Sequence, residues 1–149
     1  MNLQKHFLMR QKERKVTKIH IKIDTGMSRI GFLAGENNEE IVDEIIKISK
    51  LPYIEIEGIF SHFATSDEYD KSYTLLQYGR FMDVCNRLEE KGLNIPIKHI
   101  CNSAGIMMYP EMHLDMVRPG VILYGMYPSD EVDKSRLDLI PAMNAKNQQ

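Results

Sequence analysis

Few of the residues that build disulfide frameworks and metal sites occur in this sequence. Its 149 residues include two cysteines, Cys85 and Cys101, and neither has a companion at metal-ligand spacing. We therefore expect two reduced thiols in packed surroundings and no disulfide. The five histidines lack the i, i+4 arrangement with an acid that marks a zinc helix, and no glycine-rich loop leads into a lysine and a serine or threonine. The sequence offers no support for metal or nucleotide chemistry.

Long apolar runs are also missing. No run approaches the length of a membrane span, and Phe7 to Met9 is far shorter than the apolar core of a signal peptide. We thus expect no membrane association and a cytoplasmic location. The chain contains no internal repeat or low-complexity segment. Its 43% hydrophobic and 27% charged residues suit one globular domain with a core and argue against disorder.

Charge is unevenly distributed along the chain. The net charge is -2, yet Met1 to Lys18 holds six basic residues and one acidic residue. Such an arm can bind nucleic acid, but this one lacks interleaved aromatic residues and any recognisable binding motif. We interpret residues 1–17 as a basic, helical lead-in that lies in solvent, and we expect no nucleic-acid partner.

The stretch KIHIKIDTGMSRIGF, residues 18–32, joins a strand to a polar loop. Isoleucines alternate with His20, Lys22 and Asp24, so one face of the strand is apolar and the other is charged. A turn is expected just after Asp24, and Arg29 follows on the loop, from which it can fold back toward the strand end. The stretch is a site candidate, and the alternative is an edge strand with a solvated face.

The rest of the chain alternates apolar strands with amphipathic helices. Asn37, with Glu40 three residues later, predicts the start of the first helix, and Gly92 predicts the end of the second. We expect helices at about 37–50, 73–91 and 105–109, and strands at 18–24, 57–63, 97–101 and 114–117, with 121–124 as a continuation or a final strand. This alternation implies parallel pairing through right-handed crossovers, hence an α/β sheet or barrel.

Polar side chains follow the carboxyl ends of these predicted strands, where barrel enzymes build their sites. They are Lys22, Asp24 and Arg29 after the first strand, His62 after the second, Asn102 and Ser103 after the third, and Arg118 after the fourth. Each has a simpler interpretation as well. His62 suits a partly buried histidine bonded to a neighbour, Asn102 and Ser103 suit a helix cap, and Arg118 before a proline suits a surface turn.

Asp24, Thr25 and Gly26 also match the short signature of aspartic proteases, in which two such carboxylates share a proton. Those enzymes are all-β, whereas this chain has two clear helical patterns and a lysine beside the aspartate. The protease interpretation is therefore the weaker one.

Three blocks of sequence stand out together: KIHIKIDTGMSRIGF, GIFSHFATSDE and HICNSAGIMMYPEMHLDMVRPGVILYGMYPS. In this order they resemble alanine racemase, the pyridoxal phosphate enzyme that interconverts L- and D-alanine for peptidoglycan. The likeness extends from about Val16 to Met143, with Ser28 where glycine is more usual. It implies an α/β fold that is a partial (β/α)8 TIM barrel over residues 18–140, about the last four β/α units, with residues 141–149 beginning a linker to a C-terminal β domain.

The resemblance also implies roles for individual residues. On the cofactor side, Arg118 would bond the pyridine nitrogen of pyridoxal 5'-phosphate, Ser103, Gly120 and Val121 would contact its phosphate, and Asn102 would belong to a polar network beside Arg118. On the catalytic side, His62 would link that network toward a tyrosine of the partner subunit. Arg29 would lie near the substrate carboxylate, and Lys22 would match a lysine that is carbamylated in many family members.

Two features of the family have no counterpart in this sequence. The first is the motif that carries the lysine bound covalently to the cofactor, and the second is the tyrosine base of the partner's β domain. We therefore expect an enzyme fragment that is inactive by itself and whose full-length form is a homodimer acting on alanine. A non-catalytic remnant that serves as a binding or complementing module, and a homologue of the serine racemase type, remain open as alternatives.

Overall fold

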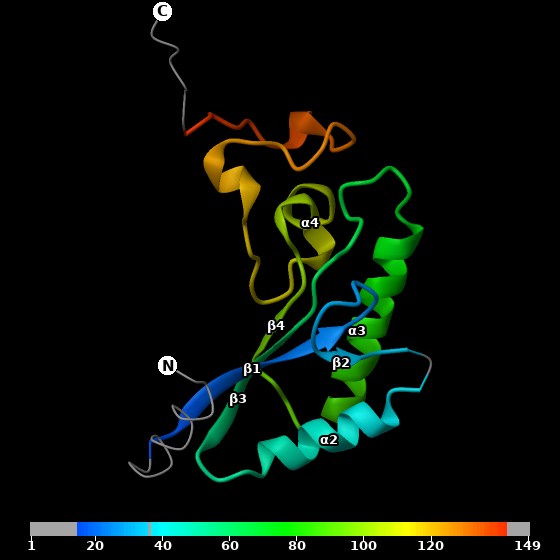
Figure 1. Cartoon of the computed structure of the whole chain (residues 1–149), viewed down its shortest axis with the longest axis vertical. Helices are drawn as coiled ribbons and strands as arrows, with labels where there is room; N and C mark the ends of the chain where they lie inside the picture. Colours follow the sequence, from blue (N-terminus) through cyan, green and yellow to red (C-terminus); the bar gives the residue numbers. More distant parts are fainter. Residues whose placement is uncertain (1–14, 36, 143–149) are drawn as a thin grey trace, which may run out of the picture.

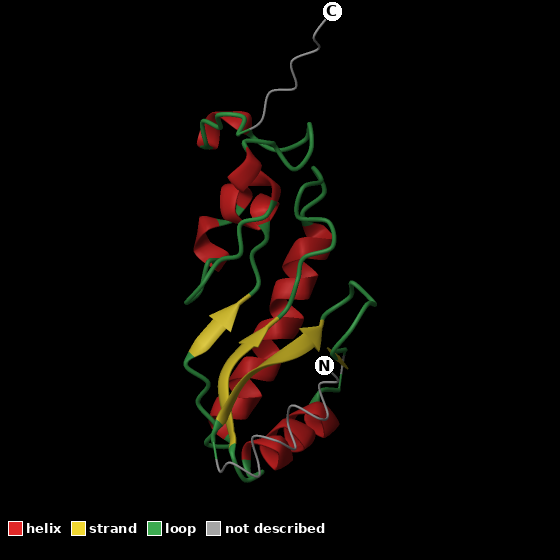
Figure 2. Cartoon of the chain, turned by 60° about the vertical axis from the view of Figure 1, so that its left-hand side comes forward, coloured by secondary structure: helices red, strands yellow, loops and turns green. Residues whose placement is uncertain are grey.

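The computed structural model describes residues 15–35 and 37–142, which form one parallel sheet with helices packed on it (Figures 1 and 2). The strands are β1 (Thr17–Asp24), β2 (Phe32–Leu33), β3 (Ile54–Phe60) and β4 (Ile97–His99). The helices are α2 (Glu39–Ser49), α3 (Ser72–Glu90) and α4 (Ser103–Met108), and the 3-10 helices are η1 (Pro110–Met112), η2 (Val121–Tyr124) and η3 (Lys134–Arg136). The strand order is β2-β1-β3-β4, and all three pairings are parallel. The predicted α/β class with parallel strands is confirmed.

One face of the sheet forms the hydrophobic core with α2 and α3. Ile21 and Ile23 of β1 and Ile59 of β3 pack against α2 and α3 side chains such as Ile45 and Phe81. The apolar side chains of β1 thus face the helices, as the alternation in residues 18–24 predicts. Its polar half lies on the other face of the sheet.

The pairing of β1 with β3 contains an irregularity that shapes this second face. Ile19 pairs with Ile56, but His20 pairs with Gly58, so Glu57 is an extra residue in β3. A bulge of this kind redirects a side chain, and Glu57 contacts both Lys18 and His20. Gly58 is required opposite His20, because a Cβ atom there would overlap the imidazole ring.

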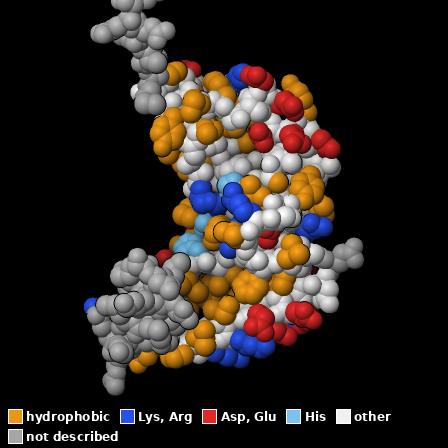
Figure 3. Space-filling model, in the orientation of Figure 1, with side chains coloured by type: hydrophobic (Ala, Val, Ile, Leu, Met, Phe, Trp, Pro, Cys, Tyr) orange, Lys and Arg blue, Asp and Glu red, His pale blue; other side chains and the backbone are white. Residues whose placement is uncertain are grey.

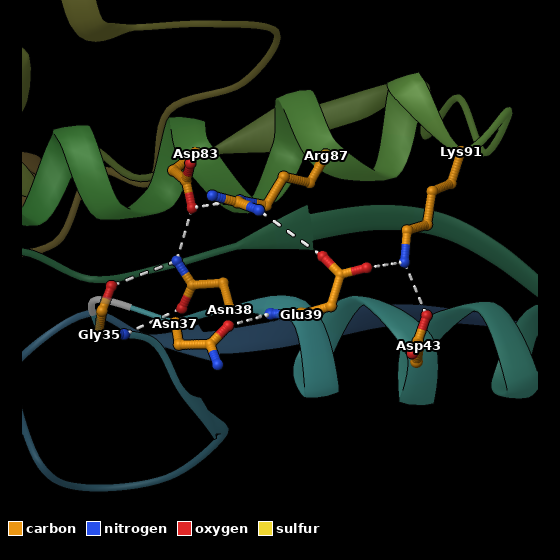
Figure 4. A network of polar contacts seen from close by, with 8 residues as sticks. All are labelled: Gly35, Asn37, Asn38, Glu39, Asp43, Asp83, Arg87 and Lys91. Carbon is orange, nitrogen blue, oxygen red and sulfur yellow. Dashed lines mark hydrogen bonds and ion pairs between the residues drawn. The ribbon is translucent and has the colours of Figure 1, made fainter.

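A polar network joins α2 to α3 and replaces the predicted cap of the first helix (Figure 4). The helix begins after Asn38, whose side chain does not cap it. Instead, Asn38 donates to Asp83 at 2.7 Å and accepts from the Gly35 N–H at 2.9 Å. Asn37 accepts from the Glu39 N–H, so the predicted capping box of Asn37 with Glu40 is wrong. Asn38 is almost fully buried, so this geometry makes the amide a link between the two helices.

The end of the chain differs most from the prediction. Residues 114–117 are not a strand: Leu114 is a turn residue with φ 55°, and the segment contacts β4 through the Asp115 N–H, which donates to the Lys98 carbonyl at 3.1 Å. The predicted strand at 121–124 is the 3-10 helix η2, which ends at Gly125 with φ 74°. The two-residue strand β2 was not predicted. The second strand, expected at 57–63, runs from Ile54 to Phe60.

Other predictions concern the cysteines, the lead-in and the membrane. Cys85 and Cys101 are free and buried, as expected. Thr17 already belongs to β1, and Lys15 and Val16 are not helical; the remainder of the predicted helical lead-in, like most of the linker at 141–149, lies outside the described residues. Among the described helices, none has the length and apolar character needed to cross a bilayer.

Candidate active site

Basic and histidine side chains gather in a hollow on the side of the molecule, on the sheet face opposite the helices (Figure 3). Phe60 of β3 lies at the centre of this cluster. The Arg118 guanidinium lies 5.3 Å from its ring centroid and the Lys22 ammonium 5.4 Å. The ring also stacks on His99 of β4, with centroids 5.0 Å apart. Cations over an aromatic face are attracted to its electrons, so Phe60 brings the predicted Lys22 and Arg118 to one place.

Arg118 is fixed by the ends of β3 and β4. Its Nη2 donates to the Ser61 carbonyl at 2.6 Å and the Ile100 carbonyl at 3.3 Å, and contacts His62 Nδ1 at 3.3 Å. Its Nη1 donates to His99 Nδ1. Within the described residues, every side-chain hydrogen bond of Arg118 uses these two terminal nitrogens, so its Nε–H has no protein partner there and can donate to a ligand. Arg118 is therefore a half-buried anchor and not the surface turn residue of the simpler interpretation.

The two histidines beside Arg118 are neutral at physiological pH. Burial, together with the positive charge of Arg118, lowers the pKa of His62 to about 4 and that of His99 to about 4. A neutral imidazole has one nitrogen that accepts a hydrogen bond, which a guanidinium requires because it only donates. Arg118 is therefore charged, whereas the imidazole rings of His62 and His99 are neutral.

Lys22 lies at the end of β1, half-buried, and donates to its neighbouring Ile23 carbonyl at 2.9 Å. The pKa of Lys22 is lowered to about 8, mainly by burial; the Asp24 carboxylate opposes this shift, and the charges of Arg118 and Arg29 add to it. A substantial share of the amine is therefore neutral in mildly alkaline solution. Arg29 lies on the exposed loop, and it forms no hydrogen bond with Lys22 in the described part of the chain.

Asp24 organises the loop that carries Arg29. Its Oδ1 accepts from the N–H groups of Gly26 at 3.0 Å and Ser28 at 2.9 Å, and its Oδ2 accepts from the Arg29 N–H at 2.7 Å. Burial raises the pKa of Asp24, but these three bonds outweigh it and hold the pKa below its usual value. The predicted turn is confirmed. Because both carboxylate oxygens serve the loop and the fold is α/β, the aspartic protease interpretation is wrong.

Ser28 adopts the left-handed conformation, with φ 57°. Glycine adopts this conformation without steric cost, whereas a side chain is disfavoured there. The preference for glycine at this position, implied by the family resemblance, thus has a physical reason in the loop itself.

A second part of the site is a cleft beside Arg118. Its volume is about 330 Å³. The residues that line it are His62, Asp67, Asn102, Ser103, Ala104, Arg118, Gly120, Val121 and Pro128. Six of the predicted site residues thus share one cleft, whereas Lys22 and Arg29 lie outside it, on the strand and loop next to it.

Asn102 and Ser103 each have a structural role in this cleft. Asn102 caps α4, because its Oδ1 accepts from the Gly105 N–H at 2.9 Å, and it also accepts from Ser66 at 2.9 Å. Ser103 accepts from the Gly120 N–H at 2.8 Å. The cap interpretation of Asn102 is therefore confirmed, and the cap itself holds the residue at the edge of the cleft.

Helix α3 holds the ends of β1 and β3 in place. Gln77, fully buried, donates to Thr25 Oγ1 and to the His62 carbonyl, both at 3.2 Å, and accepts from the Ala64 N–H at 2.8 Å. Tyr73 donates to the Gly26 carbonyl at 2.8 Å. The loop after β1 and the residue His62 thus share one support, which the helical pattern alone did not reveal.

Four further residues of the open face were not recognised from the sequence as part of the site. They are His20, Glu57, Phe60 and His99, which contact Lys22, Arg118 or one another. The strand period places His20 beside Lys22, and this signal was available. The bulge at Glu57 has no marker in the sequence other than Gly58.

Comparison with known proteins shows the family to which the chain is similar. Residues 2–128 match the family model described as "Alanine racemase, N-terminal domain". The alanine racemase of Clostridium tetani is 59% identical over 135 residues, which are 91% of this chain and 34% of that protein. The alanine racemase of Methanococcus maripaludis is 54% identical over 132 residues, which are 89% of this chain and 35% of that protein.

Solved structures of the same family share the fold. Alanine racemase of Clostridium difficile 630 in complex with cycloserine superposes with a TM-score of 0.87 at 49% identity, over 93% of this chain and 37% of that one. The Bacillus anthracis enzyme with bound L-Ala-P gives a TM-score of 0.80 at 31% identity, over 93% and 35%. This chain spans about a third of the length of these relatives. It belongs to the alanine racemase family and matches part of that family's N-terminal domain.

Proposed function

We propose that this chain is the cofactor-binding part of a pyridoxal phosphate-dependent alanine racemase, an isomerase that interconverts L- and D-alanine. The observation that carries the proposal is Arg118, held by two neutral histidines and two carbonyls at the mouth of the cleft. Residues 18–140 would form about the last four β/α units of a (β/α)8 barrel. A whole barrel takes about 250 residues, and the carboxyl ends of the strands carry the site, as in such barrels.

The cleft fits the phosphate of the cofactor. The Ser103 hydroxyl and the Gly120 N–H bond each other at 2.8 Å, and a phosphate oxygen can accept from both donors in their place. A Cβ atom at Gly120 would stand 3.3 Å from Ser103 Oγ, so the glycine keeps this approach open. Asp67 is the one acidic residue that lines the cleft. Val121 completes the proposed phosphate contacts, and Asn102 supports Ser103 through the cap of α4.

Arg118 fits the ring nitrogen. A guanidinium only donates and stays protonated, so a pyridine nitrogen bonded to it stays unprotonated. When bound, the cofactor supplies an electron sink for the bond to the α-hydrogen of alanine. Arg118 would moderate that sink, because an unprotonated ring withdraws electrons less strongly, which favours return of a proton to carbon. His62, neutral and 3.3 Å from Arg118, would connect it to the tyrosine of the partner subunit.

Lys22 and Arg29 would act on the substrate side. An unmodified Lys22 adds a cation to a site that already holds Arg118 and Arg29, and the charges of both arginines lower the pKa of Lys22. Carbamylation reverses the sign of Lys22 and requires its neutral amine, which the pKa of about 8 supplies. The carbamate can accept hydrogen bonds from Arg29 and orient it toward a substrate carboxylate.

The working enzyme would be a homodimer in which other segments supply both catalytic bases. The 149 residues contain no counterpart of the cofactor-binding lysine motif, so we expect this chain alone not to racemise alanine. Exposed apolar side chains near the described end of the chain support an assembly, among them Leu123 at 67% and Ile140 at 84% exposure. In that assembly the D-alanine would serve peptidoglycan synthesis.

Binding of pyridoxine 5'-phosphate to the purified chain tests the cofactor site. This analogue carries the ring nitrogen and phosphate but no aldehyde, so it cannot react with surface lysines. Calorimetry should show saturable binding that Arg118→Gln and Ser103→Ala each weaken by about tenfold, the loss expected for one good hydrogen bond. Arg87→Gln on α3, far from the cleft, should bind like the parent chain. Equal binding by all four proteins would contradict the proposal.

A further inference from the structure

A continuous row of polar side chains crosses the open face of the sheet and ends at Arg118. Lys18 donates to Glu57 at 2.7 Å, and Glu57 Oε2 lies 3.5 Å from His20 Nε2. His20 Nδ1 lies 2.9 Å from His99 Nε2, and His99 Nδ1 contacts Arg118 Nη1. The row thus links four elements of the fold: β1, β3, β4 and the loop after η1.

The groups at the two ends of the row, Arg118 and Glu57, determine which nitrogen of each imidazole carries the proton. Arg118 only donates, so His99 Nδ1 must accept, and a neutral His99 then carries its proton on Nε2. That proton points to His20 Nδ1, which must accept in turn, so His20 carries its proton on Nε2. This second proton faces the Glu57 carboxylate, which only accepts. The hydrogen bond with Lys18 holds the pKa of Glu57 below its usual value and keeps the carboxylate ionised.

We propose that Glu57 and His20 are positioning residues that fix the tautomer of His99 and thereby hold the Arg118 guanidinium in place. With the opposite tautomer, the N–H of His99 Nδ1 would face the N–H of Arg118, and the two donors would repel. The fold contains two features that serve this row. The bulge turns Glu57 to the open face, and Gly58 leaves room for the His20 ring.

Only the statement that Arg118 serves a cofactor rests on the proposed function. The direction of the hydrogen bonds rests on the side chains of this chain alone. The low pKa of His99, about 4 because of burial and the Arg118 charge, agrees with a neutral ring.

Nitrogen NMR of the chain labelled with 15N-histidine tests the direction of the row. We expect a scalar coupling across the hydrogen bond between His99 Nε2 and His20 Nδ1, with the proton bonded to His99. Absence of the coupling, or a proton bonded to His20 Nδ1, would overturn the proposal. This measurement needs no cofactor and no substitution, so it decides the question even where a variant fails to fold.

Three variants test the role of Glu57. Glu57→Ala removes the terminal acceptor, so both His20 tautomers should become populated and the coupling should be lost. Glu57→Gln keeps a carbonyl oxygen that accepts from His20 and should retain the coupling. Glu55→Gln is the matched control, because Glu55 lies on the same strand and also pairs with Lys18, at 3.6 Å, but does not contact His20. A coupling that persists in Glu57→Ala would refute the positioning role.

The outcome is separable from that of the proposed function. If pyridoxine 5'-phosphate fails to bind while the coupling is present, the cofactor proposal is wrong and the hydrogen-bond row stands. If the analogue binds and the coupling is absent, the row is wrong and the cofactor site stands.

Discussion

Gln77 and Thr25 form a buried hydrogen bond that joins α3 to the loop after β1, with Gln77 Nε2 donating to Thr25 Oγ1 at 3.2 Å. The same amide bonds the main chain of the segment after β3, at the His62 carbonyl and the Ala64 N–H. One side chain of the supporting helix therefore sets the spacing between the two loops that carry Arg29 and His62.

Replacing Gln77 with leucine should destabilise the fold by about 2–3 kcal/mol, because buried polar groups then lose their partners. Urea unfolding followed by circular dichroism measures the loss. Asn86→Leu on the exposed face of the same helix should change the free energy of unfolding by less than about 0.5 kcal/mol. Equal stability of the two variants would show that the Gln77 bonds are not what holds the loops.

Replacing glycine with alanine should have opposite effects on stability at Gly58 and at Gly79. Gly58→Ala places a methyl group in the His20 ring and should cost about 1–3 kcal/mol. Gly79→Ala lies in open space within α3 and should stabilise the fold by about 1 kcal/mol, because alanine favours the helix. Urea midpoints of the two variants and the parent provide the comparison. If both substitutions shift the midpoint in the same direction, the tight fit at Gly58 is wrong.

The neutral histidines make stability depend on pH. The folded pKa of His62 and that of His99 are both about 4, below the ordinary value of about 6.5. Between these values the unfolded chain binds more protons, so stability falls as pH decreases from about 6.5 to 4 and is unaffected by these groups at higher pH. Because solvent partly screens the rings, we expect about 1–2 kcal/mol from each. His62→Gln should flatten the curve in this window, and an unchanged slope would contradict the assignment.

The proposed carbamylation of Lys22 can be tested directly. In the chain incubated with 13C-bicarbonate near pH 8, we expect a carbamate carbon signal that Lys22→Arg removes. Lys47→Arg, on the exposed face of α2, is the matched control and should retain the signal.

In the reassembled enzyme, Lys22→Ala should impair racemisation and a small added carboxylate should partly restore it. Full activity of Lys22→Ala would show that Lys22 is an ordinary strand lysine.

The helices and the site-bearing strand ends could be predicted because their signals are local. The repeat of isoleucine in residues 39–49 determines the buried face of α2, and the alternation in residues 17–24 determines the two faces of β1. The predicted fourth strand was wrong for a physical reason. Residues 114–117 have an apolar pattern, but they begin in a turn at Leu114 with positive φ, and they lack a strand ladder.

The remaining parts of the site depend on contacts between distant residues. The bulge at Glu57 exists only in the pairing of β3 with β1, and β2 is too short for any pattern to reveal. In the sequence, Gln77 is an ordinary polar residue of an amphipathic helix. Its role follows only from its hydrogen bond to Thr25, which lies 52 residues away in the chain. Lys22 and Arg118 carry chemistry that the sequence suggests, but Phe60, which brings them together, is recognised only in the fold.

Racemisation by separated parts tests the central claim most directly. The chain alone, the other segments of a full-length relative alone, and the two together would each be assayed for D-alanine in the presence of pyridoxal phosphate. The account predicts no D-alanine above the free-cofactor control from either part, and clear turnover from the associated parts. D-alanine formation by the chain alone, or no turnover from parts that associate in solution, would contradict it.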